Sequence, residues 1–99
     1  MRVVLGDRLK SGDRYLLDIT FGGQLRDDML GLYRSSYQTA EGETRWIAST
    51  QFEATFARSA FPCWDEPRYK AKYKLNIQRQ LGYTVTSNMP LETSITALK

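Results

Sequence analysis

Histidine is absent from this 99-residue sequence, and cysteine occurs only once, as Cys63. Without histidine the chain cannot build a Ser-His-Asp or Cys-His catalytic group or a histidine-containing zinc site. One cysteine cannot build a thiolate-only zinc site or an internal disulfide. Cys63 stands between Pro62 and Trp64, with no imidazole to activate it. We therefore expect a buried, unreactive thiol and no catalysis by this chain alone.

Long hydrophobic runs are also missing. No apolar stretch approaches the roughly 20 residues that cross a bilayer. The first ten residues contain an apolar patch that is too short for a signal peptide. We therefore expect no membrane contact from this segment. If the native protein is secreted or anchored, the segment responsible is expected to lie outside the sequence.

Charge of one sign is not concentrated anywhere in the chain. The sequence has 14 Lys and Arg residues against 11 Asp and Glu, a mildly basic balance that suits a solvated surface. A nucleic-acid footprint would need basic side chains gathered on one face. The nearest approach is residues 68–79, where basic residues alternate with tyrosine and leucine as in a half-buried strand. We expect no nucleic-acid partner, and salt-sensitive binding to single strands would contradict this.

Alternation of apolar and polar residues, which is typical of β-strands, recurs along most of the chain. With 41% hydrophobic and 25% charged residues, the composition is that of an ordinary globular protein and argues against disorder. The polar segment 38–44 contains a glycine and predicts a hairpin loop. The fold class is therefore predicted as all-β, a sheet or sandwich built from hairpins. The alternation predicts strands at residues 15–21, 30–37, 45–52, 70–79, 83–87 and 91–98.

An interruption of the strand pattern predicts a short helical turn near residues 54–60. Alanines recur there at a spacing of three ahead of Pro62, which ends a helix. Residues 63–67 follow as a rigid loop between two prolines. The strand pattern then continues to the end of the chain, and at the N-terminus only a few residues precede the first apolar positions. We therefore expect residues 1–99 to be part of a larger domain.

Four segments carry uncommon residues in a fixed order: GLYRSSY at 31–37, ASTQFEATFARSAFPCWDEP at 48–67, KAKYKLNI at 70–77 and TSNMPL at 86–91. Together they resemble the zinc aminopeptidase N-type enzymes, peptidase family M1, and the likeness runs from about Tyr15 to the C-terminus. The resemblance implies part of the family's N-terminal β-domain, a saddle-like sheet that walls one side of the active-site cleft. The motifs of the zinc-binding catalytic domain do not occur in this sequence.

The resemblance gives Gln51 and Glu53 a role in substrate binding. On an extended segment, residues two apart point to one face while Phe52 points to the other. By resemblance, Glu53 binds the free α-ammonium group of a peptide substrate and Gln51 lines the pocket for its first side chain. An ammonium group favours a carboxylate, and this anchor would fix which peptide bond reaches the zinc. Without the resemblance, such a pair at a strand end is usually only solvated.

The other polar residues of the central segment are expected to support the structure. Arg58 in the helical turn can pair with a carboxylate of Asp65 or Glu66 and hold in place the loop that ends at Pro67. Three apolar neighbours are expected in the core: Phe61, Cys63 and Trp64.

The chain departs from the family pattern at five positions: Ala54, Phe56, Ser59, Trp64 and Arg68. Phe56 and Ser59 change the charge of the helical turn, which puts its usual salt links in doubt. None of the five positions is Gln51 or Glu53, so the predicted substrate-facing pair is retained.

Two functions remain open at this point. The first is a fragment of a zinc metallo-aminopeptidase that removes N-terminal amino acids from peptides; its partners would be peptide substrates and its own catalytic domain. By resemblance, that enzyme would lie at the plasma membrane on the extracellular side, with the cytoplasm as the alternative. The second is a truncated or inactive β-module that binds a peptide or protein partner. A His-Glu-x-x-His motif further along the gene favours the first, and a stop codon after Lys99 favours the second.

Overall fold

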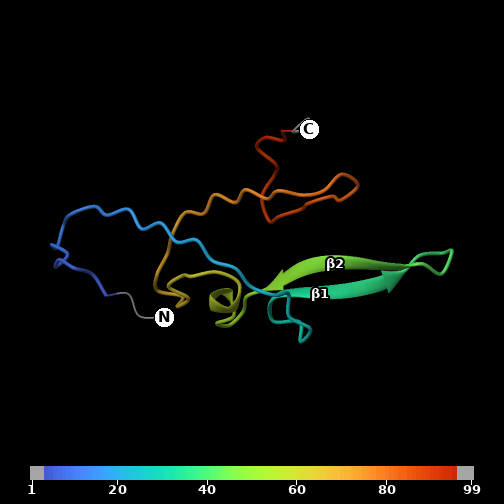
Figure 1. The fold of residues 1–99 in the computed structure, drawn as a ribbon, viewed down its shortest axis with the longest axis horizontal. Coiled ribbons are helices and arrows are strands. Elements are labelled where there is room, and N and C mark those ends of the chain that lie inside the picture. The colour runs from blue at the N-terminus through green and yellow to red at the C-terminus, as the bar shows by residue number, and fades with distance from the viewer. Residues whose placement is uncertain (1–3, 96–99) are drawn as a thin grey trace. The chain divides into compact units, whose positions relative to one another are not determined.

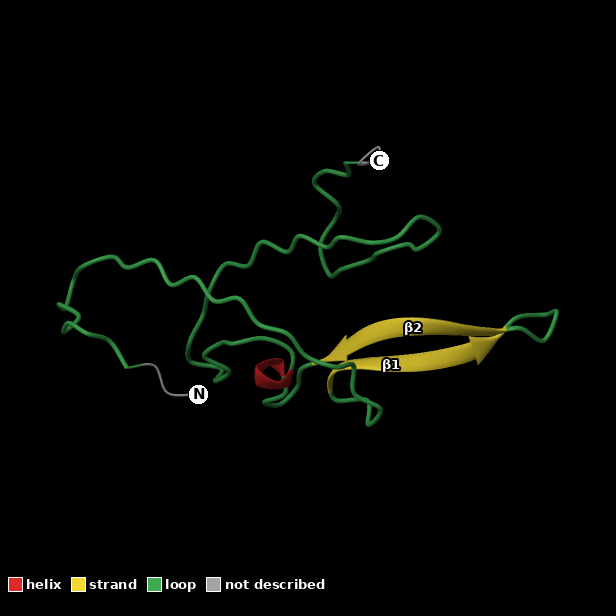
Figure 2. Ribbon diagram, viewed as in Figure 1, coloured by secondary structure: helices red, strands yellow, loops and turns green. Residues whose placement is uncertain are grey.

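The computed structural model describes residues 4–95 of the chain (Figure 1). Contacts within the chain group it into two compact units, Met1–Tyr69 and Lys70–Lys99. In the described residues, helix and strand occur only in the first unit, and loops and turns make up the remainder (Figure 2). No helix in residues 4–95 has the length and hydrophobicity needed to cross a bilayer.

An antiparallel hairpin forms the two-stranded sheet of the first unit. Strand β1 spans Gly31–Gln38 and strand β2 spans Thr44–Gln51. The register places Gly31 opposite Gln51 at one end and Gln38 opposite Thr44 at the other. Aromatic residues occur in both strands and β-branched residues in β2, and these residue types favour a pleated backbone. The strands predicted at 30–37 and 45–52 are confirmed, each displaced by one residue.

The predicted hairpin loop is also confirmed. The amide of Thr39 donates to the carbonyl of Glu43 at 2.9 Å, and the amide of Gly42 donates to the carbonyl of Thr39 at 3.0 Å. Gly42 has a φ of +83°, a left-handed conformation that L side chains rarely adopt, so a glycine suits this point of the turn. The Glu43 carboxylate accepts a hydrogen bond from Nη2 of Arg45 at 2.7 Å at the base of the loop.

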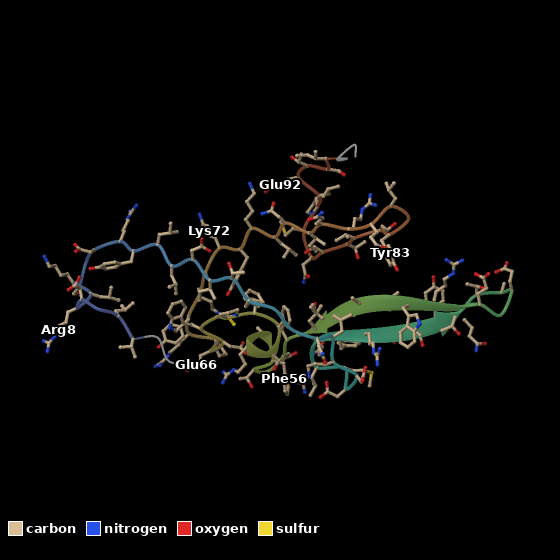
Figure 3. The ribbon with its side chains drawn as sticks, viewed as in Figure 1. Arg8, Phe56, Glu66, Lys72, Tyr83 and Glu92 are labelled. Atoms are coloured by element: carbon tan, nitrogen blue, oxygen red, sulfur yellow. The ribbon has the colours of Figure 1, made fainter. Side chains whose placement is uncertain are left out.

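The start of β1 lies directly against a short 3-10 helix, η1, which spans Ala57–Ser59. Gly31 is buried there, with a φ of +68°. A methyl group at Gly31 would lie 2.9 Å from Cβ of Ser59 and 3.2 Å from the carbonyl oxygen of Phe56, so glycine permits this close approach. Figure 3 shows Phe56 next to η1. The helical turn predicted near 54–60 is thus confirmed, as a helix of three residues.

A single parallel bridge extends the hairpin along the outer edge of β1. The amide of Arg26 donates to the carbonyl of Leu32 at 3.1 Å, and the amide of Arg34 donates to the carbonyl of Arg26 at 2.9 Å. Side chains reinforce the bridge, because Nε of Arg34 donates to Oδ1 of Asp27 at 2.6 Å. The same guanidinium lies 5.4 Å from the ring centroid of Trp46 on β2. The sequence pattern did not predict this contact.

The prediction of the other four strands was wrong for the residues that the structure describes. Residues 15–21, 70–79, 83–87 and 91–95 are not in strands, and the rest of the segment predicted at 91–98 lies outside the described residues. A strand is held by hydrogen bonds to a neighbouring strand, and within residues 4–95 the hairpin is the one sheet present. Of the all-β sheet or sandwich that we predicted, the described residues therefore form only the β1–β2 hairpin.

No apolar side chain in residues 4–95 is fully buried. The predicted inward face of residues 70–79 is open, with Tyr73 71% exposed and Leu75 67% exposed. Trp64, which was also expected in the core, is 70% exposed. Burial of apolar surface is the dominant favourable contribution to folding. The described residues therefore depend on hydrogen bonds, ion pairs and local contacts for their stability.

The contact between Gly31 and η1 predicts a large effect of a single methyl group. Gly31→Ala should destabilise the hairpin by about 2–4 kcal/mol, because it combines a left-handed backbone with a steric clash. Gly42→Ala is the matched control, since Gly42 has a φ of +83° but nothing within 4 Å of an added Cβ. Gly42→Ala should destabilise the hairpin by only about 1 kcal/mol, which corresponds to a roughly fivefold loss of amide protection against hydrogen exchange. Hydrogen exchange of the β1 amides measures both, and equal losses would contradict the close approach.

Candidate functional site

Gln51 and Glu53 lie where β2 ends and the following turn begins. Gln51 is the last residue of β2 and lies opposite Gly31. Glu53 is in the turn that leads to η1, and the peptide bond between Glu53 and Ala54 is cis. Both side chains are exposed. The extended geometry that the sequence argument assumed for both residues therefore ends before Glu53.

Phe52, between these two residues, anchors the turn. Its carbonyl accepts a hydrogen bond from the amide of Phe56 at 2.9 Å. Its ring meets Phe61 edge to face, with 5.9 Å between the ring centroids and 71° between the planes. Such edge-to-face pairs are favourable because the positive edge of one ring faces the negative face of the other. Phe52 remains 36% exposed, so it is anchored by the neighbouring loop and not by a core.

Three hydrogen bonds between Arg58 and Asp65, which we call the staple, join η1 to the loop that follows. The amide and Nε of Arg58 donate to Oδ2 of Asp65 at 2.9 Å and 3.1 Å, and Nη2 donates to the carbonyl of Asp65 at 3.0 Å. The Arg58 amide is the largest cause of a lowered pKa of Asp65; desolvation opposes it and the guanidinium adds to it. The helical turn therefore has a salt link despite Phe56 and Ser59.

Glu66 and Pro67 lie just beyond the staple. The Glu66 carboxylate is 3.1 Å from Nε of Arg68, and its carbonyl accepts the amide of Tyr69 at 2.9 Å. The Arg68 guanidinium also lies over the Tyr69 ring, 4.7 Å from its centroid. Pro67 is exposed. Of the two carboxylates in this loop, Asp65 belongs to the staple, whereas Glu66, labelled in Figure 3, pairs with its near neighbour.

Cys63 lies close to the staple and is half-buried. Burial raises the pKa of its thiol; the carboxylate of Asp65 adds to this effect and the guanidinium of Arg58 opposes it. A raised pKa leaves less thiolate at neutral pH, and the thiolate is the reactive form. The environment therefore favours an unreactive thiol, although Cys63 is less buried than the sequence suggested.

Gly31 is a positioning residue that the sequence argument missed. It pairs with Gln51 across the hairpin and lies under η1, so it fixes the end of β2 relative to the turn that carries Glu53. The glycine at the head of the GLYRSSY segment was the available signal. It could not be interpreted from the sequence, because the close approach involves Ser59, which lies far along the chain.

Glu53 differs from the other carboxylates between residues 26 and 69 because it has no partner among the described residues. It is exposed and lies two residues after the exposed amide of Gln51. An exposed, unpaired carboxylate at this position can accept hydrogen bonds from a cation that comes from outside the chain. Between residues 26 and 69 every other carboxylate is paired: Asp27 with Arg34, Asp28 with Arg26, Glu41 with Thr39, Glu43 with Arg45, Asp65 with Arg58 and Glu66 with Arg68.

The residues present do not fit a zinc site. Within residues 4–95 no group of three His, Cys, Asp or Glu side chains could hold a metal ion, and the sequence has no histidine. Zinc sites in proteins usually need three or four such ligands. The chemistry available at Gln51 and Glu53 is therefore recognition by charge and hydrogen bonding.

Comparison with known proteins identifies similar sequences along nearly the whole chain. Residues 1–97 match the sequence profile of the Peptidase M1 N-terminal domain. The chain is 46% identical over 93 residues to the thyrotropin-releasing hormone-degrading ectoenzyme of Rattus norvegicus, which covers 94% of this chain and 9% of that protein. It is 49% identical over 82 residues to endoplasmic reticulum aminopeptidase 1 of Homo sapiens, covering 83% of this chain and 9% of that protein.

A third relative is the membrane alanyl aminopeptidase of Heliothis virescens, which is 50% identical over 72 residues, or 71% of this chain and 7% of that protein. The chain thus spans less than a tenth of the length of these three relatives. No solved structure matches it.

The lowered pKa of Asp65 predicts the pH range in which the staple holds. The ionised carboxylate stabilises the folded loop at neutral pH, and this contribution is lost as the pH falls below about 4 and through the lowered pKa. We expect the Arg58 amide resonance in NMR spectra of the full chain to titrate with a midpoint below about pH 4. Asp65→Ala should abolish that titration, and a midpoint above the ordinary aspartate value would contradict the staple.

Proposed function

Because the chain belongs to the Peptidase M1 N-terminal domain family, we propose that it is a segment of a zinc aminopeptidase that removes N-terminal amino acids from peptides. In this proposal the segment supplies contacts to the substrate, and a catalytic domain outside residues 1–99 supplies the zinc chemistry. Two of the relatives described above carry the word aminopeptidase in their names. The observation that carries the proposal is the unpaired, exposed carboxylate of Glu53 at the end of β2.

Glu53 binds the α-ammonium group of the substrate in this proposal. A carboxylate and an ammonium group form a charge-assisted hydrogen bond, which is stronger than a neutral one. Since Glu53 has no partner among the described residues, binding requires no internal ion pair to break. A single carboxylate does not distinguish a peptide N-terminus from a lysine side chain. A second acidic group from the catalytic domain would add that selectivity.

Gln51 contributes to the pocket for the first side chain of the substrate. Its amide is exposed, and its backbone is fixed by pairing with Gly31 at the end of the hairpin. An amide can both donate and accept hydrogen bonds, so it can contact polar and apolar first residues alike. The Phe52 contact and the staple keep the adjoining turn and loop in place, which limits the entropy that substrate binding must remove.

The whole protein is proposed to act at the plasma membrane on the extracellular side. The names of two relatives describe one as an ectoenzyme and one as a membrane enzyme. The endoplasmic reticulum aminopeptidase among the relatives points to the secretory pathway as well. The cytoplasm, which the sequence left as the alternative, is not indicated by these names.

Removing the Glu53 carboxylate tests the ammonium contact. In the complete protein, Glu53→Ala should lower kcat/KM for peptides with a free N-terminus, with a loss of about 2–4 kcal/mol of transition-state binding. The loss is expected because the positive charge of the substrate would no longer be paired. Steady-state kinetics with an aminoacyl fluorogenic substrate measures the change.

The matched control is Glu43→Ala, since Glu43 is an exposed carboxylate at the opposite end of β2 and is paired with Arg45. That variant should keep the parental kcat/KM. Equal kcat/KM values for Glu53→Ala and the parent protein would remove Glu53 from the substrate site.

A separate prediction concerns the specificity that Gln51 confers. Gln51→Ala in the complete protein should change the order of preference among first residues, while every substrate still requires a free amine. The reason is that the amide contacts the side chain of the substrate and Glu53 contacts its charge. Relative kcat/KM values for a panel of aminoacyl substrates measure the order, with N-acetylated versions as the amine control. An unchanged order would show that Gln51 lies outside the pocket.

A further inference from the structure

Gly31 is the point at which three segments of the first unit meet. It begins β1, pairs with Gln51 at the end of β2, and lies against η1. The side chain of Arg26 also passes close by, since a methyl group on Gly31 would lie 3.6 Å from its Cδ. The structure therefore gathers around Gly31 side chains from separate parts of the sequence.

Ser59 is the side chain of η1 that approaches this point. A methyl group on Gly31 would lie 2.9 Å from Cβ of Ser59. The Cα atoms of opposed residues in an antiparallel pair are about 4.5–5.5 Å apart, and Gly31 and Gln51 are such a pair. The residue between Ser59 and Gln51 is thus a glycine, which has no side chain to separate them.

Backbone contacts hold Ser59 and Gln51 in these positions. The amide of Ser59 donates to the carbonyl of Phe56 at 3.0 Å, and the preceding residue, Arg58, belongs to the staple. Gln51 is fixed by its pairing with Gly31. A backbone that is already fixed loses little conformational entropy when a ligand binds. The two side chains are therefore presented by a preorganised backbone.

The polar groups of Ser59 and Gln51 are available to a ligand. Both residues are exposed, and neither side chain has a hydrogen-bond partner among the described residues. A hydroxyl and an amide can each donate and accept hydrogen bonds. The cation next to Ser59 in the chain, Arg58, is already paired with Asp65. The two side chains therefore offer uncharged hydrogen-bonding groups.

Ser59 is also one of the five positions at which the chain departs from the family pattern. It is eight residues from Gln51 in the sequence, and no local pattern relates it to the substrate-facing pair. In the structure it lies against Gly31, the residue opposite Gln51. A departure at this position changes the chemistry presented beside Gln51 and leaves both Gln51 and Glu53 in place.

We propose that Ser59 is a second specificity-determining residue, whose hydroxyl contacts the first side chain of the substrate together with the amide of Gln51. The inference rests on the proposed function, because it takes Gln51 as part of the pocket for that side chain. It adds the class of side chain that the pocket selects. A hydroxyl and an amide favour uncharged polar first residues over apolar ones of similar size, which would leave both groups unpaired.

A purely structural role for Ser59 makes a different prediction. The close approach to Gly31 involves Cβ of Ser59, which every residue except glycine possesses. Ser59→Ala therefore keeps the packing and removes only the hydroxyl. If Ser59 were merely a small residue under the hairpin, Ser59→Ala would affect all substrates alike.

Removal of the hydroxyl tests the contact. In the complete protein, kcat/KM is measured for two aminoacyl fluorogenic substrates, with glutamine and with methionine as the first residue. These side chains have similar lengths, and only glutamine can hydrogen-bond through an amide. Ser59→Ala should lower the glutamine-to-methionine ratio by about threefold, the effect of one hydrogen bond. Ser59→Thr retains a hydroxyl and should restore the parental ratio.

A charge placed at residue 59 tests the location of the side chain. Ser59→Lys should raise the ratio of kcat/KM for glutamate over glutamine as the first residue, and Ser59→Asp should lower it. Each shift should be about fivefold, as for two unit charges a few ångströms apart in water, and should shrink as salt is added. Loss of folded protein cannot explain opposite shifts, because it reduces the rate for both substrates equally.

The matched controls are Ser36→Lys and Ser36→Asp. Ser36 is an exposed serine of the same hairpin, opposite Trp46 and away from the end that pairs Gly31 with Gln51. Both control variants should keep the parental glutamate-to-glutamine ratio. Equal shifts in the Ser36 and Ser59 variants would overturn the proposal, because they would show a general effect of charge on the protein.

Two further results would overturn the role of Ser59: unchanged ratios in all three of its Ala, Lys and Asp variants, or a shift in the same direction for Lys and Asp. N-acetylated substrates separate this failure from that of the proposed function. If the parent protein requires a free amine and Gln51→Ala changes the order of preference, unchanged Ser59 variants refute the role of Ser59 alone. If N-acetylated substrates are cleaved equally well, the proposed function fails and this inference fails with it.

Discussion

The antiparallel register of β1 and β2 is the constraint on which the described structure depends. Because Gly31 pairs with Gln51, the end of β2 and the start of β1 lie together beneath η1, and only a glycine fits in that space. The turn with Glu53 follows directly from this point, held by the contact of Phe52 with Phe61 and by the staple. A shift of one residue in the register would turn every side chain of β2 to the opposite face and displace the site.

The sequence predicted those features that depend on neighbours along the chain. The hairpin, its loop at Gly42 and the helical turn before Pro62 all arise from short-range patterns, and all three are present. The resemblance to a family identified the segment around Glu53, although its role in binding remains a prediction. The segment at 70–79 was predicted as a strand and is not one. Alternation indicates that a segment suits a sheet, but it does not indicate whether a partner strand is available.

Contacts between residues distant in the sequence were the least predictable. The approach of Ser59 to Gly31 and the position of Arg34 between Asp27 and Trp46 each combine residues from different elements. No local pattern encodes such contacts. The expected core around Trp64 failed for a related reason, since an apolar residue is buried only where other elements cover it. Within residues 4–95, the apolar side chains therefore stay exposed because no other element packs over them.

The two ends of the hairpin differ in how much change they can tolerate during evolution. The loop at residues 39–43 is exposed apart from Thr39, and the space around Gly42 is open, so insertions there would lengthen the hairpin tip without altering the pairing of Gly31 with Gln51. The opposite end offers no such freedom, because Gly31 is enclosed by η1 and the turn with Glu53 begins at once. Diversification within this lineage should therefore accumulate at the tip, and the tip is also the natural place to graft an epitope or a fluorescent label.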